Sequence, residues 1–418
     1  MEWLYLVLAV AAVAGVPLFA VMGGVALLSF YLEGISLSAV IVELMRLSTT
    51  PSLVSIPLFT FAGYLLAESK APQRLVLFYR AWFGWLPAGL PVACLIACAF
   101  FTAFTGASGV TIIALGGLLI PILKAGNYSE KFSLGLVTTC GSLGLLFAPS
   151  LPIILYGVIS GTPINQLFLG GILPGFLMIF LLSAYSAWVV RKNPPPKEPF
   201  RLSVALLMLK KASGELLIPI VLLVLIYGGF VTVNEMSALT VFYVLILEIF
   251  VHRDISIGKD LAKIASESMV LVGGIFIILG CALGFTNYLV DAQVPLHLLD
   301  WMKQYITSPL MFLLLLNVVL LVVGSLIDIF SAIIMVPLIL PLAKAFDIHP
   351  VHLGIVFLTN MEVAYLLPPV GLNLFISSFR FRKPLTEIYS ASWPFLIVLI
   401  IGLLAVTYIP FLTLAFIE

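Results

Sequence analysis

The sequence predicts an all-α polytopic membrane protein, built as an inverted repeat that contains two re-entrant hairpins and two broken helices. Three observations support this fold class: an apolar composition, basic residues gathered in a few loops, and an internal repeat. The chain has 418 residues, of which 62% are hydrophobic and 9% charged, and its mean hydropathy is +1.22. Soluble proteins are about 45–50% apolar and about 25% charged. The composition therefore excludes a soluble enzyme, a nucleic-acid-binding protein and a single-span anchor, and it predicts that the chain lies in a lipid bilayer.

The apolar segments divide into long ones, which can cross a bilayer, and short ones, which cannot do so comfortably. A straight transmembrane helix needs about 20 apolar residues. The long segments occupy residues 5–32, 86–104, 167–190, 216–231, 236–251, 270–285, 310–323 and 393–414. Glycine, proline and hydroxyl residues interrupt the short segments at 52–66, 109–123, 134–146, 332–342 and 353–367. Such pieces suit re-entrant hairpins or broken helices buried in protein, so we expect roughly ten or eleven full crossings and two hairpins.

Basic residues indicate which side of the membrane each loop faces, because cytoplasmic loops carry an excess of lysine and arginine. Three clusters lie at residues 191–211, 253–263 and 380–383, and we expect these loops in the cytoplasm. One apolar segment follows the last cluster, so the C-terminus should lie on the periplasmic side. The N-terminal segment has no basic region before its apolar run, and we interpret it as the first crossing rather than a signal peptide. Nearly all charges lie in the loops that set the orientation.

The second half of the chain repeats the first at a constant offset in numbering, which we call the repeat offset. It places residues 121–125 (Pro-Ile-Leu-Lys-Ala) over 341–345 (Pro-Leu-Ala-Lys-Ala), and further along it places Pro149 over Pro369 without a gap. The first copy ends at basic residues and the second at the C-terminus, so the two copies should face opposite ways. Inverted repeats with broken helices in matching places are typical of secondary transporters, whose site lies between the repeats near the middle of the membrane.

In the first half, residues 104–111 are the candidate hairpin and residues 139–152 the candidate broken helix. Two glycines let the chain reverse, and Thr105 and Ser108 place hydroxyl groups where backbone groups are unpaired. Oxygen ligands of this kind, without a full carboxylate, suit a monovalent cation such as Na⁺. Helix N-termini at the same place favour an anionic group of the substrate.

The second half repeats this pattern, with a hairpin at residues 324–331 and a broken helix at 359–373. Asp328 and Glu362 are the only acids deep within these segments, where a lone carboxyl group costs about 2.5–3.5 kcal/mol. Asp328 is therefore a candidate for function, although hydrogen bonds inside the fold are an alternative explanation for either acid. The residues expected to bind substrate are Ser108, Thr111, Ser150, Asp328, Asn360 and Asn373.

Four motifs resemble one family of transporters. They are residues 56–59 (Ile-Pro-Leu-Phe), 105–108 (Thr-Gly-Ala-Ser), 169–175 (Leu-Gly-Gly-Ile-Leu-Pro-Gly) and 368–375 (Pro-Pro-Val-Gly-Leu-Asn-Leu-Phe). The chain resembles the large permease subunit of tripartite ATP-independent periplasmic (TRAP) transporters from about Val16 to Leu414. The last motif, preceded by residues 347–354, is the specific one.

The resemblance implies an elevator-type transport domain that moves within a scaffold, and Na⁺-coupled uptake of an organic anion, usually a carboxylate or a sulfonate. It implies two partners, a small four-helix membrane subunit and a periplasmic substrate-binding protein, in a bacterial or archaeal cytoplasmic membrane. It also implies two Na⁺ sites, the second by way of the repeat. The first would comprise Thr105, Ser108, Gly144, Phe147 and Pro149, and the second Gly324, Ser325, Thr359, Ala364 and Pro369.

Asp328 takes the position of a functionally sensitive acid close to the family's substrate cavity. The chain departs from the family at Ala107, where serine is commonest, and at Ala148, where proline is usual. The resemblance also suggests a division of the chain. Residues 1–50 would be N-terminal scaffold helices and 51–191 the first repeat, with the hairpin and broken helix of the transport domain. Residues 192–266 would be a basic cytoplasmic linker with two scaffold spans, and 267–418 the second repeat.

Two other functions remain open at this level. A self-sufficient Na⁺/dicarboxylate symporter of the same plan would need no binding protein. An intramembrane enzyme or a proton-translocating subunit would need a catalytic set, a metal motif or a line of charges across the membrane, and the four histidines all lie near predicted segment ends. The four cysteines lie in apolar stretches, where small packing residues are common. Na⁺ is the one cofactor expected.

Overall fold

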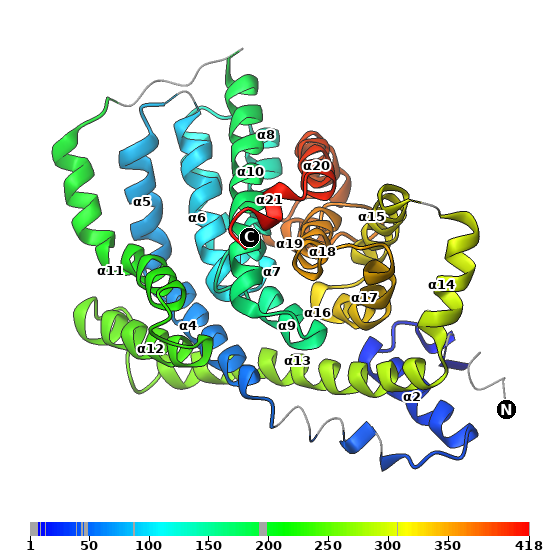
Figure 1. Cartoon of the computed structure of the whole chain (residues 1–418). Coiled ribbons are helices and arrows are strands. Elements are labelled where there is room, and N and C mark those ends of the chain that lie inside the picture. Colours follow the sequence, from blue (N-terminus) through cyan, green and yellow to red (C-terminus); the bar gives the residue numbers. More distant parts are fainter. Residues whose placement is uncertain are drawn as a thin grey trace.

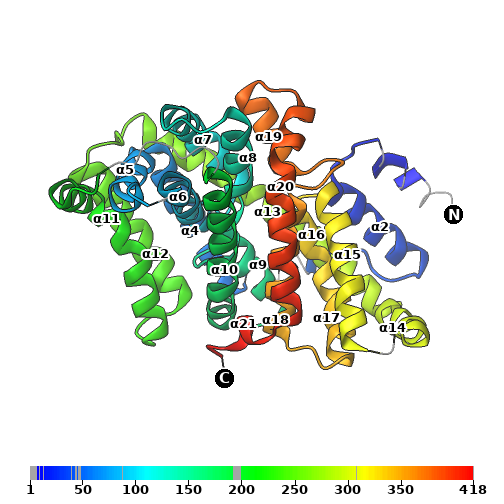
Figure 2. The same cartoon turned by 90° about the horizontal axis from the view of Figure 1, so that it is seen from above.

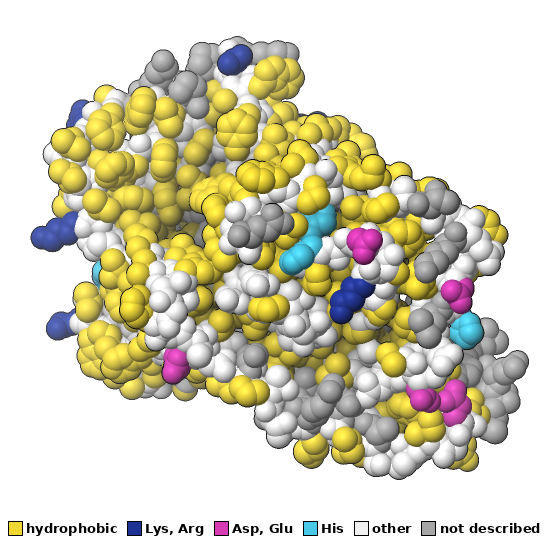
Figure 3. Space-filling view, in the orientation of Figure 1, with side chains coloured by type: hydrophobic (Ala, Val, Ile, Leu, Met, Phe, Trp, Pro, Cys, Tyr) yellow, Lys and Arg dark blue, Asp and Glu magenta, His cyan; other side chains and the backbone are white. Residues whose placement is uncertain are grey.

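The computed structural model describes residues 7–8, 10–12, 14–38, 40–42, 45, 49–86, 88–191, 199–306 and 308–417. All regular secondary structure within these ranges is helical (Figure 1). Hydrophobic side chains cover most of the face shown in Figure 3, with few charges between them. This surface suits contact with lipid, and the all-α prediction is confirmed.

One group of helices frames the molecule. In chain order it comprises α2 (Leu18–Leu32), η1 (Pro51–Val54), α4 (Ser55–Glu68), α5 (Ala71–Phe83), α11 (Leu202–Tyr227), α12 (Val233–Leu245), the π-helix η3 (Ile246–Val251) and α13 (Asp260–Asp291). α13 is the longest of these helices and runs beneath both halves of the molecule in Figure 1. α13 includes residues 266 and 267, between which we expected the linker and its two scaffold spans to end and the second repeat to begin.

The first copy of the repeat contains a helix hairpin followed by a broken helix. α6 (Gly89–Thr105) and α7 (Ser108–Ala125) form hairpin 1. α8 (Glu130–Cys140), the short 3₁₀ helix η2 (Leu143–Leu146) and α9 (Leu151–Ser160) form broken helix 1, and α10 (Ile164–Val190) closes the copy.

The second copy follows the same order. After α14 (Val294–Tyr305), hairpin 2 consists of α15 (Pro309–Leu326) and a returning arm of α16 (Ile329–Ala332), η4 (Ile333–Met335) and α17 (Val336–Ala345). Broken helix 2 consists of α18 (Pro350–Ala364) and α19 (Leu372–Phe381), and α20 (Leu385–Tyr408) and α21 (Phe411–Leu414) end the chain.

The element bounds confirm the repeat read from the sequence. The repeat offset takes the first residue of α6 to the first residue of α15, and that of α8 to that of α18. For α9 and α10 it leads to the position immediately before α19 and α20. The same offset relates the cis peptide bond Ala148-Pro149 to the cis peptide bond Pro368-Pro369. Both hairpins and both broken helices therefore lie where the sequence predicts them.

The two copies interlock rather than pack as separate domains. The returning arm α7 of hairpin 1 packs on α19, and its counterpart α17 packs on α9. In the same way α8 packs on α20, and α18 on α10. The framing helices also pack across the two copies, because α2 of the first copy packs on α13 of the second, and α12 of the second copy packs on α4 of the first. Figure 2 shows the first copy and the second copy side by side, with α20 between α10 and α15.

The number of long apolar helices is lower than expected. Six described helices have the length and composition to cross a membrane, or seven if the bent pair covering 130–160 counts as one. Glycine and proline cause the difference, since they divide apolar sequence into shorter helices. The first apolar segment, for example, is interrupted at residues 14–17 before α2 begins. Residues 192–198 of the basic linker and residue 418 lie outside the described residues.

Candidate functional site

The tip of hairpin 1 lies against the break of broken helix 1. Gly106 ends α6 with a φ of +64°, a left-handed conformation that glycine adopts without cost. A Cβ on Gly106 would collide with Leu151 at the start of α9, and a Cβ on Gly141 would lie 3.3 Å from the carbonyl oxygen of Ser108. The structure thus brings the hairpin tip to both sides of the break.

Gly144 allows the closest approach of the hairpin and the broken helix. A Cβ at this position would meet the backbone of α6 at the carbonyl oxygen of Ala99 and the amide of Ala103. Nearby, the Thr102 hydroxyl lies 2.8 Å from the carbonyl oxygen of Gly141 and 2.8 Å from the Thr111 hydroxyl. Thr111 therefore faces the inside of hairpin 1, where its hydroxyl already has a partner.

Two hydroxyl groups at this junction have no partner among the described residues. The side chains of Ser108 and Ser150 are buried, and neither Oγ makes a hydrogen bond there. Thr105 makes a long hydrogen bond to the carbonyl oxygen of Ala107, at 3.4 Å. Phe147 and Pro149 lie in the non-helical stretch between η2 and α9. The five residues of the first expected Na⁺ site are therefore gathered around one junction, while their ion binding stays a prediction.

The second expected Na⁺ site is gathered in the corresponding place. A Cβ on Gly324 would lie 2.7 Å from the Cβ of Ala364, so α15 and the end of α18 are in close contact. The amide of Gly371 donates to the carbonyl oxygen of Ser325 across the junction, at 3.0 Å. The hydroxyls of Ser325 and Thr359 donate to carbonyl oxygens of their own helices, both at 2.7 Å. Pro369 lies in the break itself.

Asp328 caps the returning arm of hairpin 2. Its carboxylate accepts hydrogen bonds from the amide of Phe330, at 3.0 Å, and the hydroxyl of Ser331, at 2.6 Å. The amide of Ile329 donates to the Tyr365 hydroxyl, at 2.9 Å, which connects the tip to broken helix 2. Asp328 is half-buried. Its carboxylate acts as the N-cap of the returning arm, because it accepts hydrogen bonds from groups at the start of that arm.

The two expected substrate-binding asparagines occupy different surroundings. Asn373 donates to the carbonyl oxygen of Thr138, at 3.2 Å, and to the hydroxyl of Ser142, at 3.3 Å, so it joins the two broken helices. Asn360 donates to Asn317 Oδ1, at 2.8 Å, and Asn317 donates to the Thr407 hydroxyl, at 3.0 Å. Asn360 therefore helps to join α18, α15 and α20.

Ser142 marks the crossing point of the two copies. Its hydroxyl donates to the carbonyl oxygen of Glu362, at 3.4 Å, and Glu362 is the counterpart of Ser142 at the repeat offset. The Glu362 side chain is fully buried, and neither carboxyl oxygen has a hydrogen-bond partner among the described residues.

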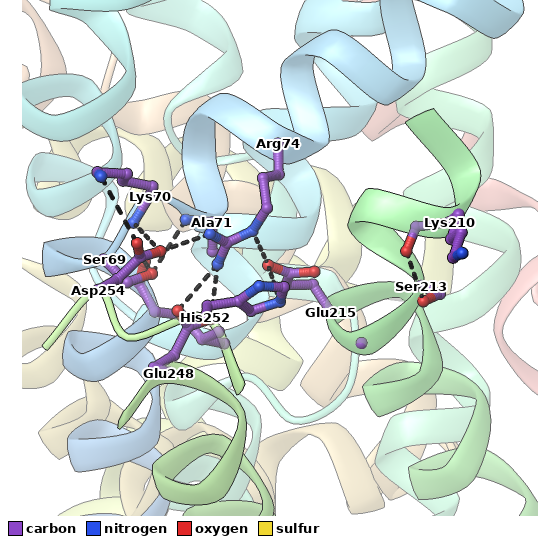
Figure 4. A network of polar contacts seen from close by, with 12 residues as sticks. Ser69, Lys70, Ala71, Arg74, Lys210, Ser213, Glu215, Glu248, His252 and Asp254 are labelled. Carbon is purple, nitrogen blue, oxygen red and sulfur yellow. Dashed lines mark hydrogen bonds and ion pairs between the residues drawn. The ribbon is translucent and has the colours of Figure 1, made fainter. Parts of the chain in front are cut away.

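Sequence reasoning missed one charged cluster, shown in Figure 4. Arg74 of α5 pairs with Glu215 of α11, Glu248 of η3 and Asp254 of the following loop. Glu215 and Glu248 have side chains that are 0% exposed. These residues are exceptions to the expectation that nearly all charges lie in loops. The one feature of the sequence that could have revealed the cluster is Glu248, an acid inside the apolar segment 236–251.

These features define a class of protein: an all-helical membrane transporter whose site is built from two hairpins and two broken helices. No group of three or more His, Cys, Asp or Glu side chains that could hold a metal ion occurs in the described ranges.

The chain belongs to the TRAP transporter large permease family. The family model "Tripartite ATP-independent periplasmic transporter, DctM component" matches residues 3–412. The C4-dicarboxylate TRAP transporter large permease protein DctM of Pseudomonas aeruginosa is 34% identical over 384 residues, which are 91% of this chain and 89% of that protein. The family resemblance is confirmed, and the chain is a transporter subunit and not an enzyme.

Other relatives carry different names. The isethionate TRAP transporter permease protein DctMQ of Oleidesulfovibrio alaskensis is 32% identical over 95% of this chain and 63% of that protein. The ectoine/5-hydroxyectoine TRAP transporter large permease protein UehC of Ruegeria pomeroyi is 29% identical over 86% of this chain and 84% of that protein. The crystal structure of the Alcanivorax borkumensis YdaH transporter matches with a TM-score of 0.60 and 16% identity, over 88% of this chain and 89% of that one, which supports the fold.

Membership places the chain in the bacterial inner membrane as a multi-pass protein. A large permease of this family works with a substrate-binding protein and a small permease subunit.

Proposed function

We propose that the chain takes up a small organic anion, a carboxylate or a sulfonate, together with Na⁺, by an elevator movement. A periplasmic substrate-binding protein delivers the anion, and a small four-helix subunit completes the membrane part with the C-terminus of this chain on the periplasmic side. The observation that carries the proposal is the junction of hairpin 1 and broken helix 1, where the buried hydroxyls of Ser108 and Ser150 have no described partner.

Na⁺ suits this junction because its ligands are hydroxyl and backbone carbonyl oxygens without a carboxylate. The first ion would bind through Thr105, Ser108, Gly144, Phe147 and Pro149, and the second through Gly324, Ser325, Thr359, Ala364 and Pro369. Each ion would hold a hairpin tip against a break, and the two tips together would form the anion site. Ser108, Ser150, Asp328 and Asn373 are the residues proposed to contact the anion, whereas Thr111 and Asn360, also expected from the sequence, have their side chains bonded inside the fold.

An anion is favoured by the helix starts at the junction of hairpin 1 and broken helix 1. α7 and α9 both begin beside the tip of hairpin 1, and the unpaired amides of helix N-termini attract negative groups. Names of relatives include C4-dicarboxylates, isethionate and ectoine, and the first two are a carboxylate and a sulfonate.

Two assays test the proposal. In the first, the thermal stability of purified protein is measured in Na⁺ and in K⁺, because a bound ion stabilises the folded state. Wild type should be stabilised by Na⁺, and Ser108→Ala should need at least roughly tenfold more Na⁺ for the same shift, which is about 1.4 kcal/mol of binding. Ser186→Ala is the matched control, since Ser186 is also buried but its hydroxyl donates to Leu182, at 2.7 Å.

In the second assay, uptake of a C4-dicarboxylate, isethionate and ectoine is measured in proteoliposomes at limiting Na⁺, with and without the binding protein. Ser108→Ala and Asp328→Ala should each sharply reduce Na⁺-dependent uptake, and uptake should require the binding protein. Wild-type uptake in both variants would sink the proposal, and uptake without a binding protein would favour a self-sufficient symporter.

A further inference from the structure

The Arg74 cluster joins the corner between the framing helices α4 and α5 to two other framing elements, α11 and η3. α4 ends at Glu68 and α5 begins at Ala71, so Ser69 and Lys70 form the corner between them. Arg74 lies one turn beyond this corner and extends its guanidinium between Glu215, Glu248 and Asp254 (Figure 4). The Glu248 carboxylate accepts from Nη2 at 2.8 and 3.0 Å.

The corner has additional bonds to the same elements. The amide of Lys70 donates to Asp254, at 3.2 Å, and its ammonium lies 3.8 Å from the same carboxylate. Burial disfavours the charge of Asp254, but the hydrogen bonds and charges of Arg74 and Lys70 outweigh burial and lower the pKa of this carboxyl group. Lys263 at the start of α13 lies 3.8 Å from Glu68 at the end of α4.

Arginine is the residue that can make this junction. Its planar guanidinium offers five N–H donors in fixed directions, whereas the lysine ammonium is a point charge with three. The Arg74 side chain is 14% exposed, so the pairs are largely removed from water. Buried pairs are screened less by salt than pairs on the surface.

The two sides of α5 differ in how they are held. Two sets of bonds connect α5 to α11. One is the Arg74 cluster, and the other is the hydrogen bond from the Trp82 indole to the carbonyl oxygen of Ala205, at 3.2 Å. α5 also packs on α6, and an apolar cavity of about 230 Å³ lies beside this contact, lined in part by Tyr79 of α5, Phe100 and Phe104 of α6, Phe147, Phe176 of α10 and Leu223 of α11. Directional bonds therefore hold α5 to α11, whereas α5 faces hairpin 1 with apolar side chains.

We propose that Arg74 is a positioning residue for transport, which fixes the α4–α5 corner to α11, η3 and the loop at Asp254 while hairpin 1 moves past it. The inference rests on the proposed elevator movement and sharpens it. It moves the border between scaffold and transport domain from residue 51 to the connection between α5 and α6, so that α4 and α5 belong to the scaffold. The moving surface is then the apolar side of α5.

Spin-label distances test this directly. The labels occupy Ala81→Cys on α5 with either Ile220→Cys on α11 or Phe180→Cys on α10, in a Cys281→Ala background because the other three cysteines are buried. Ile220 and Phe180 are 57% and 67% exposed, so their labels should not disturb packing. The distances are measured on full-length protein in nanodiscs, in K⁺ and in Na⁺.

We expect the distance from α5 to α11 to be narrow and equal in K⁺ and Na⁺, and the distance from α5 to α10 to change. In Arg74→Lys the distribution from α5 to α11 should broaden, while the Na⁺ concentration for half-maximal thermal stabilisation stays within about twofold of wild type. Arg201→Lys is the control, since Arg201 is an exposed arginine on the turn into α11.

The outcomes separate the inference from the proposed function. A distance from α5 to α11 that changes between K⁺ and Na⁺ would overturn the inference and leave the elevator movement standing. An unchanged α5–α11 distribution in Arg74→Lys would also overturn it, because Arg74 would then only stabilise the fold. No change in either wild-type distance would count against the elevator movement, and broadening in Arg74→Lys would still support the anchor. If Arg74→Lys does not fold, the wild-type distances decide.

Discussion

The two copies of the repeat bring a hairpin and a broken helix into close contact, but they place the necessary small residue on opposite partners. In the first copy Gly144 of the broken helix packs against the backbone of α6. In the second copy Gly324 of the hairpin packs against Ala364, the residue that corresponds to Gly144. Both copies therefore have a close contact between hairpin and broken helix, but the glycine that allows it lies at a different position in each copy. Close approach of two helix backbones needs a glycine on only one of them.

The copies also differ in the chemistry of their tips and corners. The tip of hairpin 1 is uncharged and has the unpartnered Ser108 hydroxyl, whereas the tip of hairpin 2 carries Asp328 with two donors. Arg74 anchors the first corner, and its counterpart in the second copy is Val294. Among the residues whose side chains are described, no ion pair joins α14 to another element. One corner is thus fixed by charge, and at the other α14 packs on α13 and α17.

The largest effect should come from a methyl group at the contact in the first copy. Gly144→Ala would place a Cβ against backbone atoms of α6, which cannot move without shifting the helix. We expect a loss of about 3 kcal/mol or more, at the upper end for overpacking, and loss of Na⁺-induced stabilisation. Thermal unfolding in detergent measures both.

Gly324→Ala sharpens the comparison. Its Cβ would lie 2.7 Å from the Cβ of Ala364, which moves only with α18, and 2.9 Å from the end of the Met361 side chain, which can move by itself. The overlap is smaller than at Gly144, so the cost should be about 2 kcal/mol. Equal losses for Gly144→Ala and Gly324→Ala would contradict the view that the first contact is the tighter one.

A smaller effect should come from the polar contacts found in the second copy alone. Asn317, Asn360 and Thr407 join α15, α18 and α20, whereas Ala97, Cys140 and Ala187 occupy the same positions in the first copy. Asn317→Ala should cost about 1–2 kcal/mol, because hydrogen bonds between helices in a membrane contribute about 0.6–1.7 kcal/mol. Thermal unfolding measures this loss, and a cost below that of Cys140→Ala, which alters the first-copy counterpart of Asn360, would refute it.

The smallest effect should come from the crossing point of the copies. Ser142→Ala removes one hydrogen bond to the Glu362 carbonyl oxygen and one from Asn373. Both are long, so we expect a loss of about 0.5–1 kcal/mol with no change in Na⁺ dependence. Thr138→Val, which removes a hydroxyl bonded to Ser377 at 2.9 Å, is a matched comparison from the same interface. A change in Na⁺ dependence with Ser142→Ala alone would place Ser142 in an ion site.

The sequence by itself determined the all-α membrane fold, the repeat, the two hairpins and the two breaks. It could do so because apolar length, glycine, proline and a constant repeat offset can be read along the chain without knowing how the helices pack. It also selected residues of the two junctions, which the structure brings together. Composition did not show where an apolar run bends, and therefore did not show that six described helices, or seven with the bent pair, have the length and composition to cross a membrane.

Only the tertiary structure decided which residues face one another. Thr111 matches the polar pattern of the tip, yet its hydroxyl is used inside hairpin 1, beside Thr102. Arg74 and Glu215 are 141 residues apart in the chain and lie in contact, and no local pattern encodes a pair at that separation. Ion pairs and close backbone contacts depend on how helices pack, so the anchor at Arg74 and the opposite placement of Gly144 and Gly324 became visible only in three dimensions.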